Sequence, residues 1–212
     1  MAPPFVIAVD GPAASGKGTL SKRLASDLGL NHLDTGLLYR AVGAAMLEAG
    51  GDLDDPDGCA LVARSLDLAT LDPDFLAQHH IGEAASKVAV HPPVRAALLQ
   101  AQREFADRAP GAVLDGRDIG TVVCPNAPAK LYITASIDAR AARRHAQAVA
   151  KDPSVTLDAI KADLARRDAR DAGRSDAPMT QADDALLLDT TEMSIDAAFS
   201  AARDFVSSKR PA

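Results

Sequence analysis

The segment GPAASGKGT, residues 11–19, restricts the fold more than any other part of this 212-residue chain. It follows an apolar run at 5–9 and precedes a stretch in which Leu20, Leu24 and Leu28 recur before Gly29. A buried strand, a glycine-rich loop and an amphipathic helix that ends at glycine are the context of a phosphate-binding loop. We therefore predict that this segment binds the phosphates of a nucleotide.

The predicted loop consists of Gly11, Pro12, Ala13, Ala14, Ser15, Gly16, Lys17, Gly18 and Thr19. Its backbone N–H groups would surround a phosphate at the start of the helix, and Lys17 would reach the outer phosphates. Pro12 has no N–H group, so the donors should begin at Ala14. A hydroxyl residue normally follows the lysine and binds Mg²⁺, whereas here Gly18 takes that place and Thr19 comes second. The alternative, a glycine-rich turn that binds nothing, leaves the flanking strand and helix unexplained.

Alternating patterns of apolar residues predict the rest of the fold. Short stretches indicate further strands at 30–33, 112–116, 129–136 and 185–189, and those at 112–116 and 129–136 are expected to be buried. Helical spacing indicates helices from about 38 to 50, from 92 past 105, from 138 to 149 and from 194 to 206. Residues 51–58 read as an acidic loop, followed by a small insertion up to 91. Strands that alternate with helices predict an α/β fold with a central, mainly parallel sheet.

Composition limits the classes of partner. The net charge is −6, the aromatic fraction is 3% and Trp is absent, which argues against a nucleic-acid or anionic-membrane surface. No segment resembles a signal peptide or a membrane span, so we expect a cytoplasmic protein. Cys59 and Cys124 lie far apart and are expected to be buried or half-buried thiols. The histidines are isolated or adjacent and show no metal-ligand spacing.

The segment VLDGRDIGTVVCPNAPAKLYITAS, residues 113–136, carries the most specific motif. Asp115 follows a buried strand, where a carboxylate can hold Mg²⁺ through water, and Arg117 and Asp118 follow in the turn. With GPAASGKGT, LDTGLLYR (33–40) and RRDARDAGR (166–174), this segment closely resembles bacterial cytidylate kinases over nearly the whole chain. This chain differs slightly from the family pattern at two places. It has Ala13-Ala14-Ser15 where a serine and a further glycine are common, and Thr35 where serine is common.

The resemblance implies a P-loop NTPase fold with a central five-stranded parallel sheet in a single domain, 1–212. Its core would comprise 1–36, 92–149 and 178–212, with a nucleoside-monophosphate-binding insertion at 37–91 and a lid at 150–177. The implied activity is transfer of the ATP γ-phosphate to CMP or dCMP, with Mg²⁺, by a monomer. The segment DTTEMS, 189–194, would flank the adenine of ATP.

The resemblance also implies roles for individual residues. Catalysis would rest on Lys17, Arg117, Arg170 and Arg174, with Arg170 free to swing onto the transferring phosphates. Asp115 would hold the metal through water, with Thr19 as a second candidate ligand. In the acceptor site, Ser86, Arg95 and Asp118 would read cytosine, and Arg167 and Asp171 would lie near the ribose. The acceptor phosphate would be held by Arg40, Arg117 and Arg174, and Thr35 is a further acceptor-site residue.

The chemistry of cytosine agrees with these roles. An ionised Asp118 can accept from the exocyclic amine while Arg95 donates to the ring acceptors. Uracil presents a carbonyl in place of the amine, and a buried mismatch of this kind costs about 1–3 kcal/mol. We therefore expect CMP and dCMP to be preferred over UMP.

Other interpretations remain open from the sequence. The arginines at 167, 170 and 174 share one helical face by spacing, which also suits a solvated helix with ion pairs. The chain could be another small P-loop kinase that acts on UMP, AMP or a non-nucleotide acceptor. A GTP-dependent switch would need an Asn-Lys-x-Asp motif, which the sequence lacks. A non-catalytic nucleotide-binding protein would leave Lys17, Asp115 and the arginines unexplained.

Overall fold

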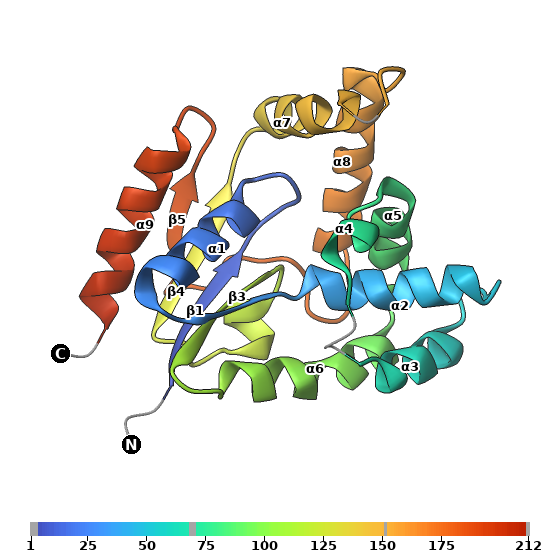
Figure 1. The fold of residues 1–212 in the computed structure, drawn as a ribbon, viewed down its shortest axis with the longest axis horizontal. Helices are drawn as coiled ribbons and strands as arrows, with labels where there is room; N and C mark the ends of the chain where they lie inside the picture. The colour runs from blue at the N-terminus through green and yellow to red at the C-terminus, as the bar shows by residue number, and fades with distance from the viewer. Residues whose placement is uncertain (1–3, 68–70, 151, 211–212) are drawn as a thin grey trace.

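The computed structural model describes residues 4–67, 71–150 and 152–210, and its centre is a parallel sheet with helices on both faces (Figure 1). The strand order is β2-β3-β1-β4-β5. The strands are β1 (Phe5–Asp10), β2 (Asn31–Asp34), β3 (Gly111–Gly116), β4 (Ala129–Thr134) and β5 (Leu186–Asp189). The five predicted strands are confirmed to within two residues at each end.

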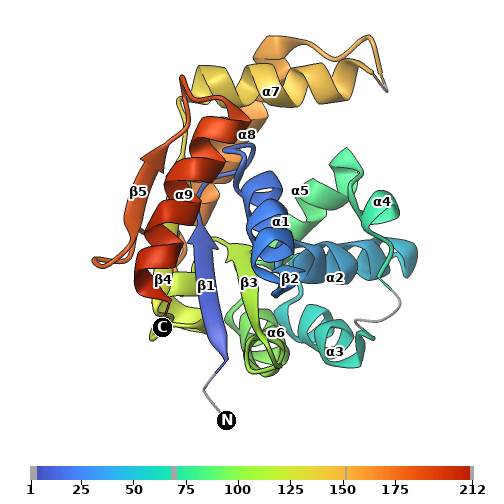
Figure 2. The same ribbon diagram turned by 60° about the vertical axis from the view of Figure 1, so that its left-hand side comes forward.

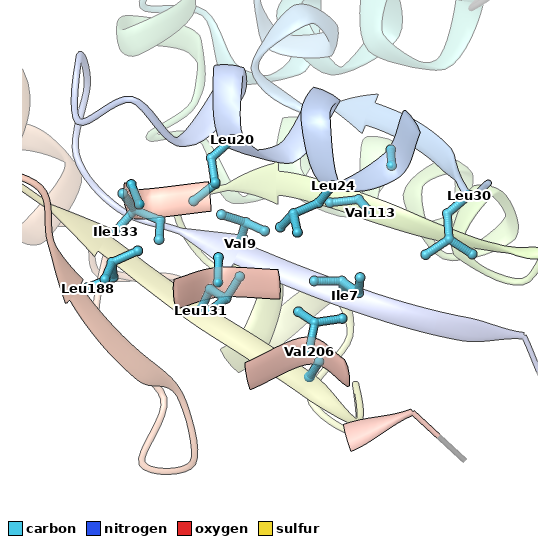
Figure 3. Close-up of a cluster of buried hydrophobic side chains, with 14 of the residues drawn as sticks. Ile7, Val9, Leu20, Leu24, Leu30, Val113, Leu131, Ile133, Leu188 and Val206 are labelled. Carbon is cyan, nitrogen blue, oxygen red and sulfur yellow. The ribbon is translucent and has the colours of Figure 1, made fainter. Parts of the chain in front are cut away.

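One face of the sheet is covered by α1 (Lys17–Leu28) and α9 (Ile195–Lys209). Figure 3 shows the cluster that joins them, in which Leu24 of α1 and Val206 of α9 meet Ile7 and Val9 of β1. Ala8, between these two, faces the opposite side and is also buried. Because β1 is covered on both faces, its sequence is a continuous apolar run and not an alternating one.

The other face is covered by α6 (Pro92–Ala106) and by a π-helical turn, η2 (Ile119–Val123). The apolar side of α6 continues beyond the sheet and packs against α2 (Gly36–Glu48) and α3 (Pro56–Ser65). Cys59 lies inside this second cluster and Cys124 is half-buried, and both are free thiols, as predicted. The α2–α3 region is therefore anchored to the core through α6.

The region between α2 and α6 contains α3, α4 (Pro73–Leu76) and α5 (His79–Val88). The predicted loop at 51–58 is wrong in its last three residues, because α3 begins at Pro56. The Asp55 side chain accepts a hydrogen bond from the N–H of Asp57, so an aspartate cap followed by proline starts the helix. Farther on, α5 crosses α2 so closely that a Cβ on Gly43 would lie 2.9 Å from the Cβ of Ala84.

Helices α7 (Ile137–Val149) and α8 (Leu157–Ala172) form an arm above the carboxyl ends of the strands (Figures 1 and 2). Ala141 of α7 packs against Ile160 and Leu164 of α8. The prediction that Arg174 shares a helical face with Arg167 and Arg170 is wrong, since α8 ends at Ala172 and Gly173 caps it. Across the described ranges, no helix has the length and apolar character needed to cross a membrane.

Candidate active site

A cavity of about 690 Å³ lies at the carboxyl ends of the strands, where ligands bind in parallel α/β sheets. It is lined by residues of the loop after β1, of α2, α5, α7, α8 and of the start of α9. The predicted site residues that line it are Ala13, Ala14, Ser15, Gly16, Lys17, Gly18, Thr19, Thr35, Arg40, Ser86, Asp115, Arg117, Asp118, Arg167, Asp171 and Arg174. The predicted residues outside its lining are Gly11, Pro12, Arg95 and Arg170.

The glycine-rich loop owes its shape to the backbone. Gly16 has φ 92° and directly precedes α1, so the first N–H groups of the helix face the cavity. Ala14 also has a positive φ, 60°, which is uncommon for a residue with a Cβ. The Nζ of Lys17 donates to the carbonyl of Pro12 at 3.2 Å, so the lysine lies across the loop. Burial, with a contribution from Arg117, lowers the pKa of Lys17 to about 8.

Gly11 serves the packing of the loop on the sheet. It has φ 143°, and a Cβ at this position would lie 1.9 Å from the carbonyl oxygen of Ile133 in β4. Any side chain would therefore push the loop away from β4. Gly11 and Gly16 thus have different tasks, close packing at Gly11 and a left-handed turn at Gly16.

Two carboxylates stand side by side at the ends of β2 and β3. Asp34 and Asp115 are paired in register between these parallel strands, so their side chains lie on the same face. Burial and the charge of Asp115 raise the pKa of Asp34. Nε2 of His32 lies 2.8 Å from Oδ2 of Asp115, and Oγ1 of Thr35 donates to the Asp115 carbonyl at 2.8 Å. Asp115 is therefore held by neighbours on β2 and just after it.

The first turn of α1 lies next to Asp115. A Cβ on Gly18 would lie 3.9 Å from Oδ1 of Asp115, in ordinary contact, and both residues line the cavity. Thr19 also lines the cavity and is exposed. A carboxylate oxygen and a hydroxyl are ligands that suit Mg²⁺, which keeps several of its waters in protein sites. The residues present therefore fit a hydrated magnesium ion beside the loop.

Asp10 ties the end of β1 to the turn that follows β3. Its two carboxylate oxygens accept from the N–H groups of Ile119 and Gly120, each at 2.7 Å. Burial raises the pKa of Asp10 to about 6, because two N–H donors only partly replace the lost water. Asp118 immediately precedes this anchored turn, so Asp10 helps to fix the position of Asp118.

At the far end of the cavity, Asp118 of the lining forms a buried ion pair with Arg95 of α6, which is outside the lining. Arg95 also has its Nε 3.4 Å from Oδ2 of Asp176, and its guanidinium lies 5.7 Å from the centre of the Tyr39 ring. Burial raises the pKa of Asp118 against the opposing charge of Arg95, and burial raises the pKa of Tyr39 to about 12. A ring and a fixed carboxylate at the end of a cavity can bind a planar base.

Arginines occupy the middle of the cavity. Asp171 lies between two of them: it accepts from Nε of Arg117 at 2.8 Å and pairs with Arg174. Burial would raise the pKa of Asp171, but these two guanidinium groups lower it. Arg167 has a buried Nε with no hydrogen-bond partner among the described residues. Arg40 donates to the carbonyl of Leu76 at 2.7 Å, and burial lowers its pKa to about 10.

Arg170 contacts α5 instead of lining the cavity. Its Nη1 donates to Oγ of Ser86 at 2.7 Å, and its Nη2 donates to Oε1 of Glu83 at 2.9 Å. At the opposite end of the cavity, Thr190 donates to the carbonyl of Ser15 at 3.0 Å and lies beside Met193, Ser194 and Ile195. The segment predicted to flank adenine therefore borders the glycine-rich loop.

Comparison with known proteins identifies the family. The family model described as Cytidylate kinase matches residues 7–206. The chain belongs to the cytidylate kinase family. A cytidylate kinase of Caulobacter vibrioides is 61% identical over 206 residues, which cover 97% of both chains. One from Rhizobium meliloti is 58% identical over 202 residues, 95% of each chain.

A solved structure from Eubacterium ventriosum, described as an uncharacterized protein, shares the fold of this cytidylate kinase family member. It is 13% identical, with a TM-score of 0.54, and the match covers 96% of this chain and 99% of that one. The predicted α/β fold, with its five-stranded parallel sheet of the P-loop kinase type, is confirmed. The resemblance drawn from the motifs is confirmed as well.

Sequence reasoning did not find four residues of this cytidylate kinase family site: His32, Asp34, Tyr39 and Glu83. Asp34 had a signal, because it directly follows the stretch predicted as a strand at 30–33. Tyr39 lies in the motif LDTGLLYR one residue before Arg40. His32 and Glu83 had no local signal, since their partners are distant in the sequence.

Proposed function

We propose that this member of the cytidylate kinase family transfers the γ-phosphate of ATP to CMP and dCMP, giving CDP or dCDP and ADP. The observation that carries the proposal is one cavity that runs from the glycine-rich loop, past Arg117 and Arg174, to Asp118. Family membership supports phosphorylation of cytidine monophosphate. We further propose that the protein acts as a monomer in the cytoplasm.

The donor end would hold ATP. The N–H groups from Ala14 to Thr19 would bind its phosphates together with Lys17, and residues 190–195 would flank its adenine. Asp115, with Thr19 as a second candidate, would hold a hydrated Mg²⁺, which supplies positive charge between the phosphates when bound. His32 and Thr35 would keep Asp115 oriented toward that position.

The acceptor end would hold CMP. Asp118 and the hydroxyl oxygen of Ser86 would accept from the two N–H groups of the cytosine amine, while Arg95 would donate to the ring acceptors. Arg40, Arg117 and Arg174 would bind the acceptor phosphate through their planar guanidinium groups, and Arg167 and Asp171 would contact the ribose. UMP would place a carbonyl against the carboxylate of Asp118, which costs about 1–3 kcal/mol.

The transfer step needs little from the protein beyond position and charge. An oxygen of the CMP phosphate attacks the γ-phosphorus of ATP, the bond from that phosphorus to the bridging oxygen breaks, and ADP leaves with the electron pair. The attacking oxygen belongs to a phosphate that is largely ionised at neutral pH, so no general base is assigned. Lys17, Arg117, Arg170 and Arg174 would stabilise the charge of the transferring group.

The chain would move in three parts during this reaction. We assign 1–36, 92–149 and 178–212 to the core, 37–91 to the part that carries the acceptor, and 150–177 to the lid. Closure of the lid would exclude water, which otherwise competes with CMP for the γ-phosphate.

The experiment is ADP production from ATP and Mg²⁺ with CMP, dCMP, UMP and AMP offered in parallel. We expect rapid turnover with CMP and dCMP, and a value of kcat/KM for UMP that is about 10- to 100-fold lower. The absence of CDP would overturn the proposal. Equal or faster turnover with UMP would favour the alternative, a small P-loop kinase with a different acceptor.

A further inference from the structure

A side-chain bridge connects α8 to α5 at the acceptor side of the cavity. Arg170 donates to Ser86 at 2.7 Å and to Glu83 at 2.9 Å through different nitrogens of its guanidinium group. Glu83 and Ser86 are three positions apart on α5, so they lie on one face of that helix. Figure 1 shows α8 coming down beside α5, which brings together residues 84 and 87 positions apart in the sequence.

Glu83 holds the charged part of this bridge. The side chains of Glu83 and Arg170 are 32% and 26% exposed, so the pair is partly shielded from water. Burial would raise the pKa of Glu83, but Arg170, with smaller effects of Arg167 and Arg166, lowers it. The second oxygen, Oε2, is buried without a hydrogen-bond partner among the described residues, so the hydrogen bonding of this carboxylate rests on Arg170.

The bridge occupies a group that the acceptor needs. Ser86 is buried and lines the cavity, and its hydroxyl oxygen accepts a hydrogen bond from Arg170. Under the proposed function, the same oxygen accepts from the exocyclic amine of cytosine. The amine and the Arg170 guanidinium are both donors to this one buried oxygen, so CMP and Arg170 compete for it, and Glu83 favours Arg170 in that competition.

Release of Arg170 would change the charge near the phosphates. Arg167 and Arg174, on either side of Arg170 in the sequence, both line the cavity, whereas Arg170 is turned toward α5. When the base takes Ser86, Arg170 loses one of its two partners and can turn toward the transferring phosphate. Until then, the site lacks one guanidinium group that would otherwise promote attack by water on ATP.

We propose that Glu83 is a positioning residue that holds Arg170 on Ser86, away from the transferring phosphate, until the acceptor base displaces it. Glu83 thereby makes the movement of the Arg170 guanidinium to the transferring phosphate depend on binding of the cytidine nucleotide. This inference rests on the proposed function. It makes the choice between CMP and water as acceptor depend on a residue that touches neither substrate.

The test is Glu83→Gln, which keeps the shape of the side chain and removes its charge. We expect ADP production without any acceptor to rise about 5-fold or more, and the KM for CMP to fall by a similar factor. The KM for ATP should stay within twofold. Glu104→Gln is the matched control, because Glu104 is exposed on α6 and bonds to Gln100. It should behave as the wild type in all three measurements.

A second pair of variants shows whether Glu83 acts through Arg170. In an Arg170→Ala background, Glu83→Gln should change neither acceptor-free ADP production nor the KM for CMP. Persistence of either change in that background would overturn the proposal, since a general structural effect of Glu83 would not need Arg170. If Glu83→Gln fails to fold in a thermal melt, Glu83→Asp retains the charge but shortens the reach, and should shift both quantities in the same direction.

The outcomes separate this proposal from the proposed function. Wild-type protein that makes no CDP from CMP would remove the proposed function, whatever Glu83 does. Wild-type protein that makes CDP, together with a Glu83→Gln variant that matches it in acceptor-free ADP production and in KM for CMP, would remove only the role of Glu83.

Discussion

The two ends of the cavity would bind their ligands through different kinds of group. At the donor end, the loop from Ala13 to Thr19 presents main-chain N–H groups, and Lys17 rests on a carbonyl of the same loop. At the acceptor end, the groups are side chains, and several guanidinium groups already have a carboxylate partner. These pairs are Arg95 with Asp118, Arg117 and Arg174 with Asp171, and Arg170 with Glu83.

The difference has a physical cause. An N–H group at the start of a helix is fixed by the backbone and carries only a partial charge. It therefore needs no counterion while the phosphate site is empty. A half-buried guanidinium group is costly to leave unpaired, and a nearby carboxylate offsets this cost. The donor end is therefore preformed, whereas the acceptor end must exchange internal ion pairs for contacts with its ligand.

The largest effect should come from Lys17→Ala at the donor end. Loss of a charged donor beside the transferring phosphate should lower kcat by about 10²- to 10³-fold. If the two ends work separately, the decrease is the same with CMP, dCMP and UMP. Steady-state ADP production measures it, with Lys161→Ala on the exposed side of α8 as control. A decrease in kcat with CMP alone would contradict the idea that the donor end acts independently of the acceptor end.

Asp118→Asn should change the choice of acceptor. The amide can donate to the carbonyl of uracil, so the ratio of kcat/KM for CMP over UMP should fall about 10- to 100-fold. The KM for ATP should not change, because Asp118 lies at the opposite end of the cavity from residues 190–195. Parallel assays with the two acceptors measure the ratio. An unchanged ratio would show that cytosine is read by other groups.

The pH dependence should differ between the two ends. Lys17 has a pKa of about 8 in the free protein, so its positive charge is lost as the pH rises through that value. The affinity for a non-hydrolysable ATP analogue should therefore fall about 10-fold between pH 7 and pH 9. The affinity for CMP should change less than the affinity for the analogue over this range. Calorimetric titration at pH 7, 8 and 9 tests both, and a flat profile for the analogue would be the contrary result.

The smallest effect should come from Ala14→Gly in the loop. Ala14 adopts a left-handed conformation, which costs about 1–2 kcal/mol for a residue with a Cβ. Glycine removes this strain but gives the unfolded chain more freedom, worth about 0.4–1 kcal/mol. The net gain in the free energy of unfolding should be about 0.5 kcal/mol, seen as a rise of about 1–2 °C in Tm. The preference for CMP should not change, and a fall in Tm would show that the loop is not strained at Ala14.

Most of the fold could be predicted, because strands and helices follow local patterns of apolar residues. The errors lie where two local signals conflict. At 51–58, the acidic composition suggests a loop, whereas Asp55-Pro56 starts a helix. At Arg174, regular spacing suggested a continuous helix, although Gly173 stood between the arginines and caps it.

The sequence by itself determined the strand–loop–helix unit, the motif that marks the cytidylate kinase family and the types of charged residue in the site, because each of these is encoded in consecutive or regularly spaced residues. Only the tertiary structure decided which carboxylate faces which arginine or histidine. Asp171 pairs with Arg117, His32 meets Asp115 and Glu83 holds Arg170. Such partners come from separate elements, and a short-range interaction between side chains depends on where the packed helices and strands place them, not on their spacing along the chain.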